Sequence, residues 1–285
     1  MQFLRSSTNC VIKREINGAL RYFPAKSIHK HLAMSDTTES SRLHVLQAIE
    51  DGWTGFTKAP LPFVLFTLLS GALGLIFQIM SHSAVVMSSG GTSPSSVSIL
   101  LTIIAVIGST IISLWAVTGL IRGAWKALGG HKPSFADLTR WDGKAAGRLF
   151  INQLVLAVVL VIILFIAVAL GTGLFQINQA LAVIPGIVAG IVFVYLGVNQ
   201  KFLPFIAILE EGSPINKIQR GRTVVDPSWW WMLLLLVVEL LILGIGLLLN
   251  GVGLLVASPL VICISTAAYR QLFGCEDQTG FLSDN

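Results

Sequence analysis

Six long runs of apolar residues dominate the pattern of this chain. They cover residues 60–80, 97–121, 149–170, 180–198, 228–249 and 252–273. A run of about 20 apolar residues, coiled as a helix, matches a bilayer hydrocarbon core of about 30 Å. Because only helices and closed barrels satisfy their backbone groups in lipid, such runs favour helices. We therefore expect an all-α, polytopic membrane bundle with six transmembrane helices.

A shorter helical pattern precedes the first run. Leu43, Leu46, Ile49, Trp53 and Phe56 recur at spacings of three and four residues, which places them on one face of a helix. Such a helix is suited to lie in the membrane interface. It is equally suited to pack against the spans of the same protein, and the sequence does not separate these alternatives.

Helix-start signals also precede the third and fifth runs. Ser134 and Asp137 have the spacing of a capping box, in which each side chain accepts a hydrogen bond from the other residue's backbone N–H. Ser213 is suited as an N-cap, with Pro214 at the first helical position. Ser41 opens a comparable unit before the first run. We expect an internal repeat of three hairpins, each preceded by a cytoplasmic amphipathic elbow helix.

The basic residues are distributed very unevenly between the connections. Residues 81–96, residues 171–179 and the turn at 250–251 contain no Lys or Arg. Residues 122–148 contain six and residues 201–222 contain four. Loops rich in Lys and Arg stay in the cytoplasm. We therefore expect a multi-pass protein of the inner (plasma) membrane with both termini cytoplasmic.

Composition supports a membrane protein and sets the domain boundaries. The chain has 285 residues, 54% of them hydrophobic and 12% charged, and a mean hydropathy of +0.80. Residues 41–274 form the expected transmembrane domain and 275–285 a short cytoplasmic tail. Residues 1–40 are polar and basic; we expect them to be disordered, or a mis-assigned extension with Met34 as the true start. The net charge is +5, and the basic residues flank the spans, where lipid headgroups attract them. No nucleic acid partner is therefore expected.

Glu239 is the acidic residue inside a span and the first candidate for function. Ionisable groups in a membrane are costly and usually face the bundle interior. It is suited as a proton-relay or cation-binding carboxylate, or as a protonated carboxyl bonded to a neighbouring helix. No Lys, Arg or His lies near the middle of another expected span to pair with it. On that basis Glu239→Gln is expected to leave folding nearly intact.

Polar residues interrupt the apolar pattern after the fourth run. Asn199, Gln200 and Lys201 are followed by Pro204. This pattern suits a broken helix that lines a path through the protein. It also suits a helix that simply extends to the headgroups, with the Lys201 ammonium reaching outward. Gln153, at the start of the third span, is a further intramembrane polar candidate.

Tryptophans and glycines suggest how the helices are placed. Indoles are enriched at both membrane–water interfaces, which predicts anchoring by five of them: Trp53, Trp141, Trp229, Trp230 and Trp231. Small residues allow helices to approach closely, which predicts helix packing at four glycines: Gly71, Gly74, Gly186 and Gly190.

Recognisable catalytic patterns do not occur in the sequence. It has no H-E-x-x-H, no Walker A and no G-x-S-x-G, and its five histidines lie outside the expected spans. We therefore expect no catalytic residues, no metal, no cofactor and no intrinsic enzyme activity.

Two segments carry a family resemblance. The runs GLIRGAWKALGGHKPSFADL and ILEEGSPINKIQRGRTVVDPSWWWMLLLL resemble the uncharacterised bacterial six-span membrane proteins related to the glycerophosphoryl diester phosphodiesterase membrane domain. The resemblance spans about residues 41–274 and implies an elbow before each hairpin. Ile218 and Arg222 stand where small residues would be expected. The phosphodiesterase catalytic domain of some relatives is absent from this sequence, so the resemblance implies no catalytic residues.

These observations favour a non-enzymatic membrane protein, acting as a scaffold, assembly or envelope-homeostasis factor. Its expected partners are the lipid bilayer and other membrane proteins, or further copies in a homo-oligomer. The alternative is a small transporter or channel that uses Glu239 and the Asn199–Pro204 break. A membrane partner for a separately encoded enzyme is a third option.

Membrane sidedness gives the first testable prediction. In a background without the native cysteines, Ser89→Cys should react with a membrane-impermeant maleimide added outside intact cells. Lys132→Cys should react only after the membrane is opened, because it lies in the most basic loop. Labelling of Lys132→Cys from outside, or of Ser89→Cys only from the cytosol, would overturn the topology.

Overall fold

The structure is a computed structural model that describes residues 43–89, 96–249 and 251–283. Its helices are α3 (Val45–Thr57), α4 (Pro60–Ser89), α5 (Ser96–Leu128), α6 (Phe135–Thr139), α7 (Gly143–Phe175), α8 (Val183–Asn199), α9 (Leu203–Leu209), α10 (Pro214–Val225), α11 (Trp229–Leu248) and α12 (Leu254–Phe273), with a 3₁₀ turn at Asp226–Ser228. The expectations for residues 1–40, including the start at Met34, lie outside the described residues.

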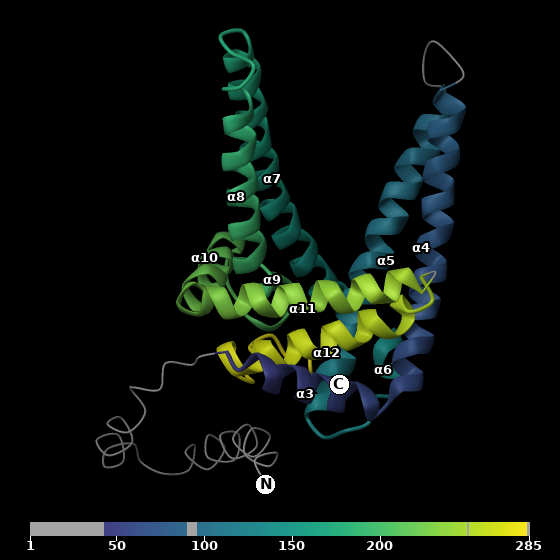
Figure 1. Cartoon of the computed structure of the whole chain (residues 1–285). Coiled ribbons are helices and arrows are strands. Elements are labelled where there is room, and N and C mark those ends of the chain that lie inside the picture. The colour runs from purple at the N-terminus through teal and green to yellow at the C-terminus, as the bar shows by residue number, and fades with distance from the viewer. Residues whose placement is uncertain (1–42, 90–95, 250, 284–285) are drawn as a thin grey trace.

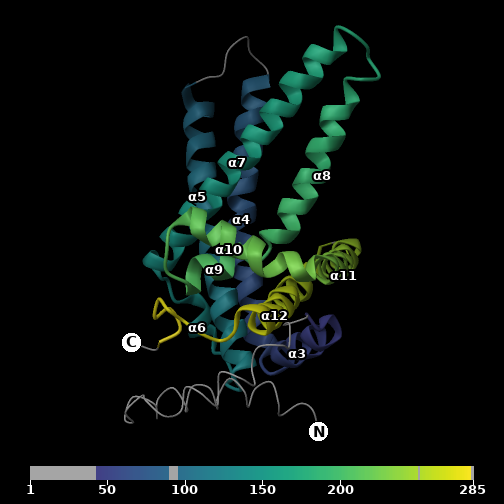
Figure 2. The ribbon, with the colours of Figure 1, turned by 90° about the vertical axis from the view of Figure 1, so that its left-hand side faces the viewer.

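The long helices form two upright arms and a crosswise pair. Helices α4 and α5 form one arm, α7 and α8 the other, and the arms diverge away from a shared base (Figure 1). Helices α11 and α12 run across the base between them, and in the turned view α11 is seen nearly end-on (Figure 2). The expected arrangement of six transmembrane helices as three hairpins stays a prediction.

Length and hydropathy identify five to six candidate spans in the described residues. Five helical segments are long and apolar enough alone, and α8 qualifies only when joined to α9 across a bend of 41°. The chain is thus an all-α protein with several membrane-spanning helices. Helices α3, α6 and α10 lie where elbows were expected, but the threefold repeat and their elbow role stay predictions.

The base is organised around α9. Every residue of this helix except Pro204 is buried. Phe202, which precedes it, packs edge-on against Phe205, Tyr269 and Phe273. An apolar helix of seven residues is too short to span a membrane, so its apolar surface is covered by protein.

Helix α3 packs against α12 through its small residues. A Cβ at Gly52 would lie 2.6 Å from the Ile264 backbone, so glycine is required for this close approach. The apolar residues expected on one face of this helix are only partly buried: Leu43 and Phe56 are buried, while Leu46 and Trp53 are exposed. The helix therefore contacts α12 and still presents apolar side chains outward.

The predicted packing glycines do not mediate contacts within this chain. A Cβ added at Gly71, Gly74, Gly186 or Gly190 would meet no atom within 4 Å in the described residues. Other glycines make the close approaches: Gly52, Gly108, Gly119, Gly246 and Gly253. The prediction was wrong for packing inside the chain because small-residue spacing does not say which face of a helix meets another. Packing of these four glycines against another molecule stays a prediction.

The start of α6 confirms the predicted capping box. The Ser134 hydroxyl accepts from the Asp137 N–H, and the Asp137 carboxylate accepts from the Ser134 N–H. Lys126 also pairs with Asp137 at 3.0 Å. Burial alone would raise the pKa of Asp137, but the bonds from Ser134 and Lys126 outweigh it and hold that pKa below its ordinary value.

Candidate functional site

The helix break between α8 and α9 brings the candidate residues together. Helix α8 ends at Asn199, and α9 begins at Leu203 with Pro204 in its first turn. Proline has no N–H and cannot continue the hydrogen-bond pattern of α8. Of the two alternatives for this segment, the structure shows the broken helix, and the break lies in the protein base. The expectation that the Lys201 ammonium reaches outward to the headgroups was wrong, because this side chain is only 10% exposed.

Lys201 pairs with Glu239, and Ser265 completes the cluster. The Lys201 ammonium lies 2.6 Å from Glu239 Oε2, and the Ser265 hydroxyl donates to Glu239 Oε1 at 2.9 Å. The Glu239 side chain is 7% exposed. We call Lys201, Glu239 and Ser265 the break cluster. The expectation that Glu239 has no cationic partner was wrong, because the bend turns the residues after α8 toward α11.

Polar groups also donate hydrogen bonds to the backbone carbonyl groups at the C-terminal end of α9. Lys217 Nζ donates to Ala207 O, and Arg148 Nη2 donates to Ile208 O, each at 3.2 Å. The chain after α12 supplies further donors: Thr279 Oγ1 to Ile208 O at 2.7 Å and Gln278 N to Leu209 O at 2.9 Å. The last carbonyls of a helix lack partners within it, and cations are favoured at that end. Part of the expected short tail therefore contacts α9.

The remaining break residues are held by α10. Gln200 Nε2 donates to Ile218 O at 3.0 Å. A Cβ at Gly221 would lie 3.1 Å from Asn199 O, so glycine permits the close approach of α10. Asn199 Nδ2 donates to Asp226 Oδ1 at 3.0 Å. Two of the predicted candidates, Asn199 and Gln200, therefore brace the break.

Asp226 connects α8 to the start of α11. Its carboxylate accepts from Asn199 and from the Tyr195 hydroxyl, the latter at 2.9 Å, and it pairs with Arg222 at 3.4 Å. Asp226 does not cap α11, which begins after Ser228 without a side-chain cap. The carboxylate instead joins the three polar side chains around it.

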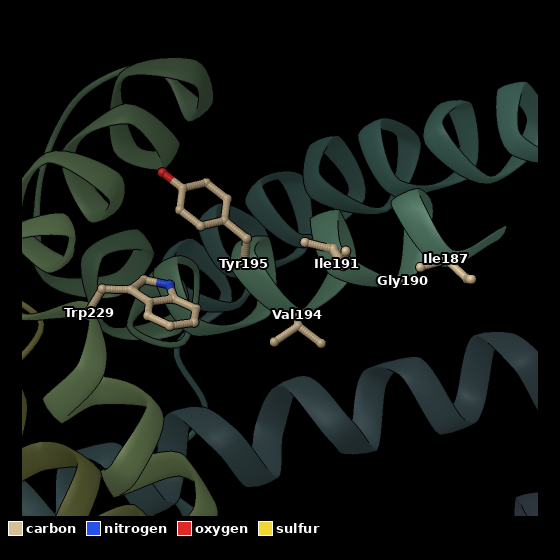
Figure 3. A pocket seen from close by; sticks show the side chains of 6 residues that line it. All are labelled: Ile187, Gly190, Ile191, Val194, Tyr195 and Trp229. Atoms are coloured by element: carbon tan, nitrogen blue, oxygen red, sulfur yellow. The ribbon is translucent and has the colours of Figure 1, made fainter. Parts of the chain in front are cut away.

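An apolar groove lies beside this network. It has a volume of about 630 Å³ and is lined by Ile187, Gly190, Ile191, Val194, Tyr195 and Trp229 (Figure 3). Most of its wall comes from one face of α8, and Trp229 closes the end nearest α11. The groove lies where α8 meets the base and is distinct from the break cluster.

The other predicted residues are dispersed. Gln153 is exposed on α7, and among the described contacts none joins it to the break cluster. Trp53, Trp141, Trp230 and Trp231 are exposed, as interfacial anchors require, whereas Trp229 packs between Tyr195 and Trp230. Anchoring by these tryptophans stays a prediction.

The break cluster can carry out only limited chemistry. It contains one amine, one carboxyl and one hydroxyl, so a proton can be exchanged between Lys201 and Glu239. In the described part of the chain, no three His, Cys, Asp or Glu side chains are grouped so that they could hold a metal ion. The arrangement is suited to hold two helices together or to respond to protonation.

Sequence reasoning missed Ser265, Lys217, Arg148 and the residues after α12. Only the pairing of Lys201 could have been inferred from the sequence. Lys201 is an ionisable residue close to Pro204, and the fifth span contains Glu239, an acid for which the sequence shows no partner within another span. Ser265, by contrast, resembles any small polar residue in a membrane helix. Its role depends on which face of α12 meets α11.

The ion pair predicts strong coupling between Lys201 and Glu239. Removing one partner of a buried pair leaves an uncompensated charge and costs about 3–5 kcal/mol. We therefore expect Glu239→Gln or Lys201→Gln to lower the thermal unfolding midpoint in detergent. The double variant should recover most of the loss, because two neutral amides can bond to each other.

Glu211→Gln is the matched control, since Glu211 is an exposed acid and surface changes usually stay within about 0.5 kcal/mol. If Glu239→Gln costs no more than Glu211→Gln, or if the losses in the double variant simply add, the pair contributes nothing.

Comparisons with models of known protein families, with curated proteins and with solved structures found no match. The resemblance to the phosphodiesterase-related membrane proteins therefore stays an expectation. The hydropathy and helix lengths identify the chain at a coarser level: it is a helical, multi-span membrane protein.

Proposed function

We propose that this chain is a non-enzymatic scaffold or assembly factor of a bacterial inner membrane, with both termini in the cytoplasm. The proposal includes the three-unit repeat and the elbow role of α3, α6 and α10. Its partners would be other membrane proteins, or further copies of the chain, bound within the bilayer and at the elbows.

The open apolar surface of the two arms carries this proposal. In the most apolar 18-residue stretch of α7 no residue is buried, and in those of α4 and α5 only 17% are. Phe165 on α7 is 73% exposed. Apolar surface of this extent must be covered by lipid or by other proteins. Arms that diverge from a packed base offer such partners long contact surfaces.

The distribution of polar groups supports the same proposal. The ion pairs and hydrogen-bonded side chains of the base are used to satisfy helix ends and to join helices. They leave the arms almost wholly apolar. Intramembrane ionisable residues that serve transport usually face one another or a water-filled cavity along the pathway.

Photo-crosslinking from the arms tests the scaffold proposal. A photoreactive phenylalanine at Phe165 should yield a discrete protein adduct in native membranes, either with a second copy or with one defined membrane protein. The same probe at Phe66, which is buried inside the chain, is the control and should not yield that adduct. Adducts with lipid alone, at Phe165 and along both arms, would overturn the proposal.

A small transporter or channel is the second candidate, and the break cluster favours it. A broken helix with an ion pair of two buried side chains resembles the ion sites of many transporters, where helices are interrupted at the site. In this function the Lys201–Glu239 pair would open and close as a substrate or proton passes.

Reconstitution into liposomes separates the two functions. A scaffold should give no flux of protons, small cations or amphiphiles above that of empty liposomes. A transporter should give flux that is lost in the double variant Glu239→Gln with Lys201→Gln, whose fold is expected to be largely kept, and that persists in the Glu211→Gln control. Flux that is equal in the double variant and in the control would exclude the Lys201–Glu239 pair from the path.

A further inference from the structure

The groove beside α8 has the shape and chemistry of a site for one apolar chain. Ile187, Ile191 and Val194 lie on one face of the helix at spacings of four and three residues. Gly190 lies between them, and a Cβ there would meet no atom of the described structure within 4 Å. The missing side chain hollows this face. The volume of about 630 Å³ lies within the range of about 300–1,000 Å³ typical of ligand sites.

One cation and one anion lie side by side next to Tyr195, at the edge of the groove and outside its apolar lining. Arg222 Nε donates to the Tyr195 hydroxyl at 3.1 Å and to Asp226 Oδ2 at 3.4 Å. The Arg222 side chain is 62% exposed and that of Asp226 is 40% exposed. Both groups therefore have hydrogen-bonding capacity left for a ligand. Their charges balance, so the site is not simply an anion site.

Trp229 supplies a donor between the apolar and the charged parts. Its indole Nε1 is buried and has no hydrogen-bond partner among the described residues. The ring lies against Tyr195 with 6.4 Å between centroids, and its nitrogen is on the side of that tyrosine (Figure 3). Buried indole N–H groups usually have an acceptor. A ligand oxygen at the end of the groove would provide one.

We propose that the groove binds a phospholipid with a primary-amine headgroup, of the phosphatidylethanolamine class. One acyl chain lies along Ile187, Ile191 and Val194. An ester carbonyl oxygen accepts the Trp229 N–H. The phosphate faces Arg222 and the ammonium faces Asp226.

Charge complementarity selects this lipid over others. A headgroup with only negative charge would gain from Arg222 but would be repelled by Asp226. A choline headgroup carries the positive charge but has no N–H to donate to the carboxylate. A helix of another protein would need to cover Arg222 and Asp226, and burying such a pair costs free energy unless it is fully bonded.

Native mass spectrometry of the purified full chain with defined lipids tests the site. We expect retained phosphatidylethanolamine in preference to phosphatidylglycerol and phosphatidylcholine with matched acyl chains. Trp229→Phe keeps the ring and removes the N–H, and should weaken retention about fivefold, as loss of one hydrogen bond implies. Trp230→Phe is the control, because Trp230 is 76% exposed and does not line the groove.

Two further variants keep the test decisive. Asp226→Asn should abolish the preference for phosphatidylethanolamine over phosphatidylglycerol, since the ammonium loses its counter-charge. Gly190→Leu places a side chain in the groove, and its Cβ would meet no described atom within 4 Å, so it should abolish retention while the unfolding midpoint is kept. Equal retention of all three lipids, or retention unchanged in both Trp229→Phe and Gly190→Leu, would overturn the proposal. Occupation of the groove by a second copy of the chain would also overturn it.

Discussion

The fold depends on satisfying the carbonyl end of one short buried helix. Helix α9 lies in the middle of the base, where its last carbonyls are out of reach of water. Unsatisfied backbone groups in an apolar medium cost several kcal/mol each. Arg148 from α7, Lys217 from α10 and the chain after α12 supply the missing donors. Three distant parts of the sequence must therefore meet at this one helix end.

The bend before α9 brings together the charges of the base. It turns Lys201 toward Glu239 and leaves Asn199 and Gln200 in contact with α10. Desolvating an ion pair costs free energy that its attraction only partly offsets. Such a pair therefore specifies which helices meet more than it stabilises the fold. That role is compatible with a static scaffold and with a pair that opens during transport.

The arms and the base differ in where their polar and apolar side chains lie. The base buries its polar groups in pairs and keeps its apolar residues in contact with one another. The arms present apolar side chains outward, which is stable only in lipid or against another apolar surface. The groove lies where these regions join, beside α8 and the start of α11. A molecule with an apolar chain and a polar head fits such a boundary.

Hydropathy alone determined that the chain is helical and membrane-spanning, because a run of about 20 apolar residues has few other stable forms. Local chemistry likewise determined the capping box at Ser134, since it depends on residues close in sequence. The sequence left a broken and a continued helix open before Pro204, and the structure decided for the break. Only the tertiary structure decided that α11 and α12 cross the base, that Gly52 rather than Gly74 touches another helix, and that Lys201 pairs with Glu239. These depend on which helix faces meet, and in a uniformly apolar helix no periodic pattern marks the face that will be buried.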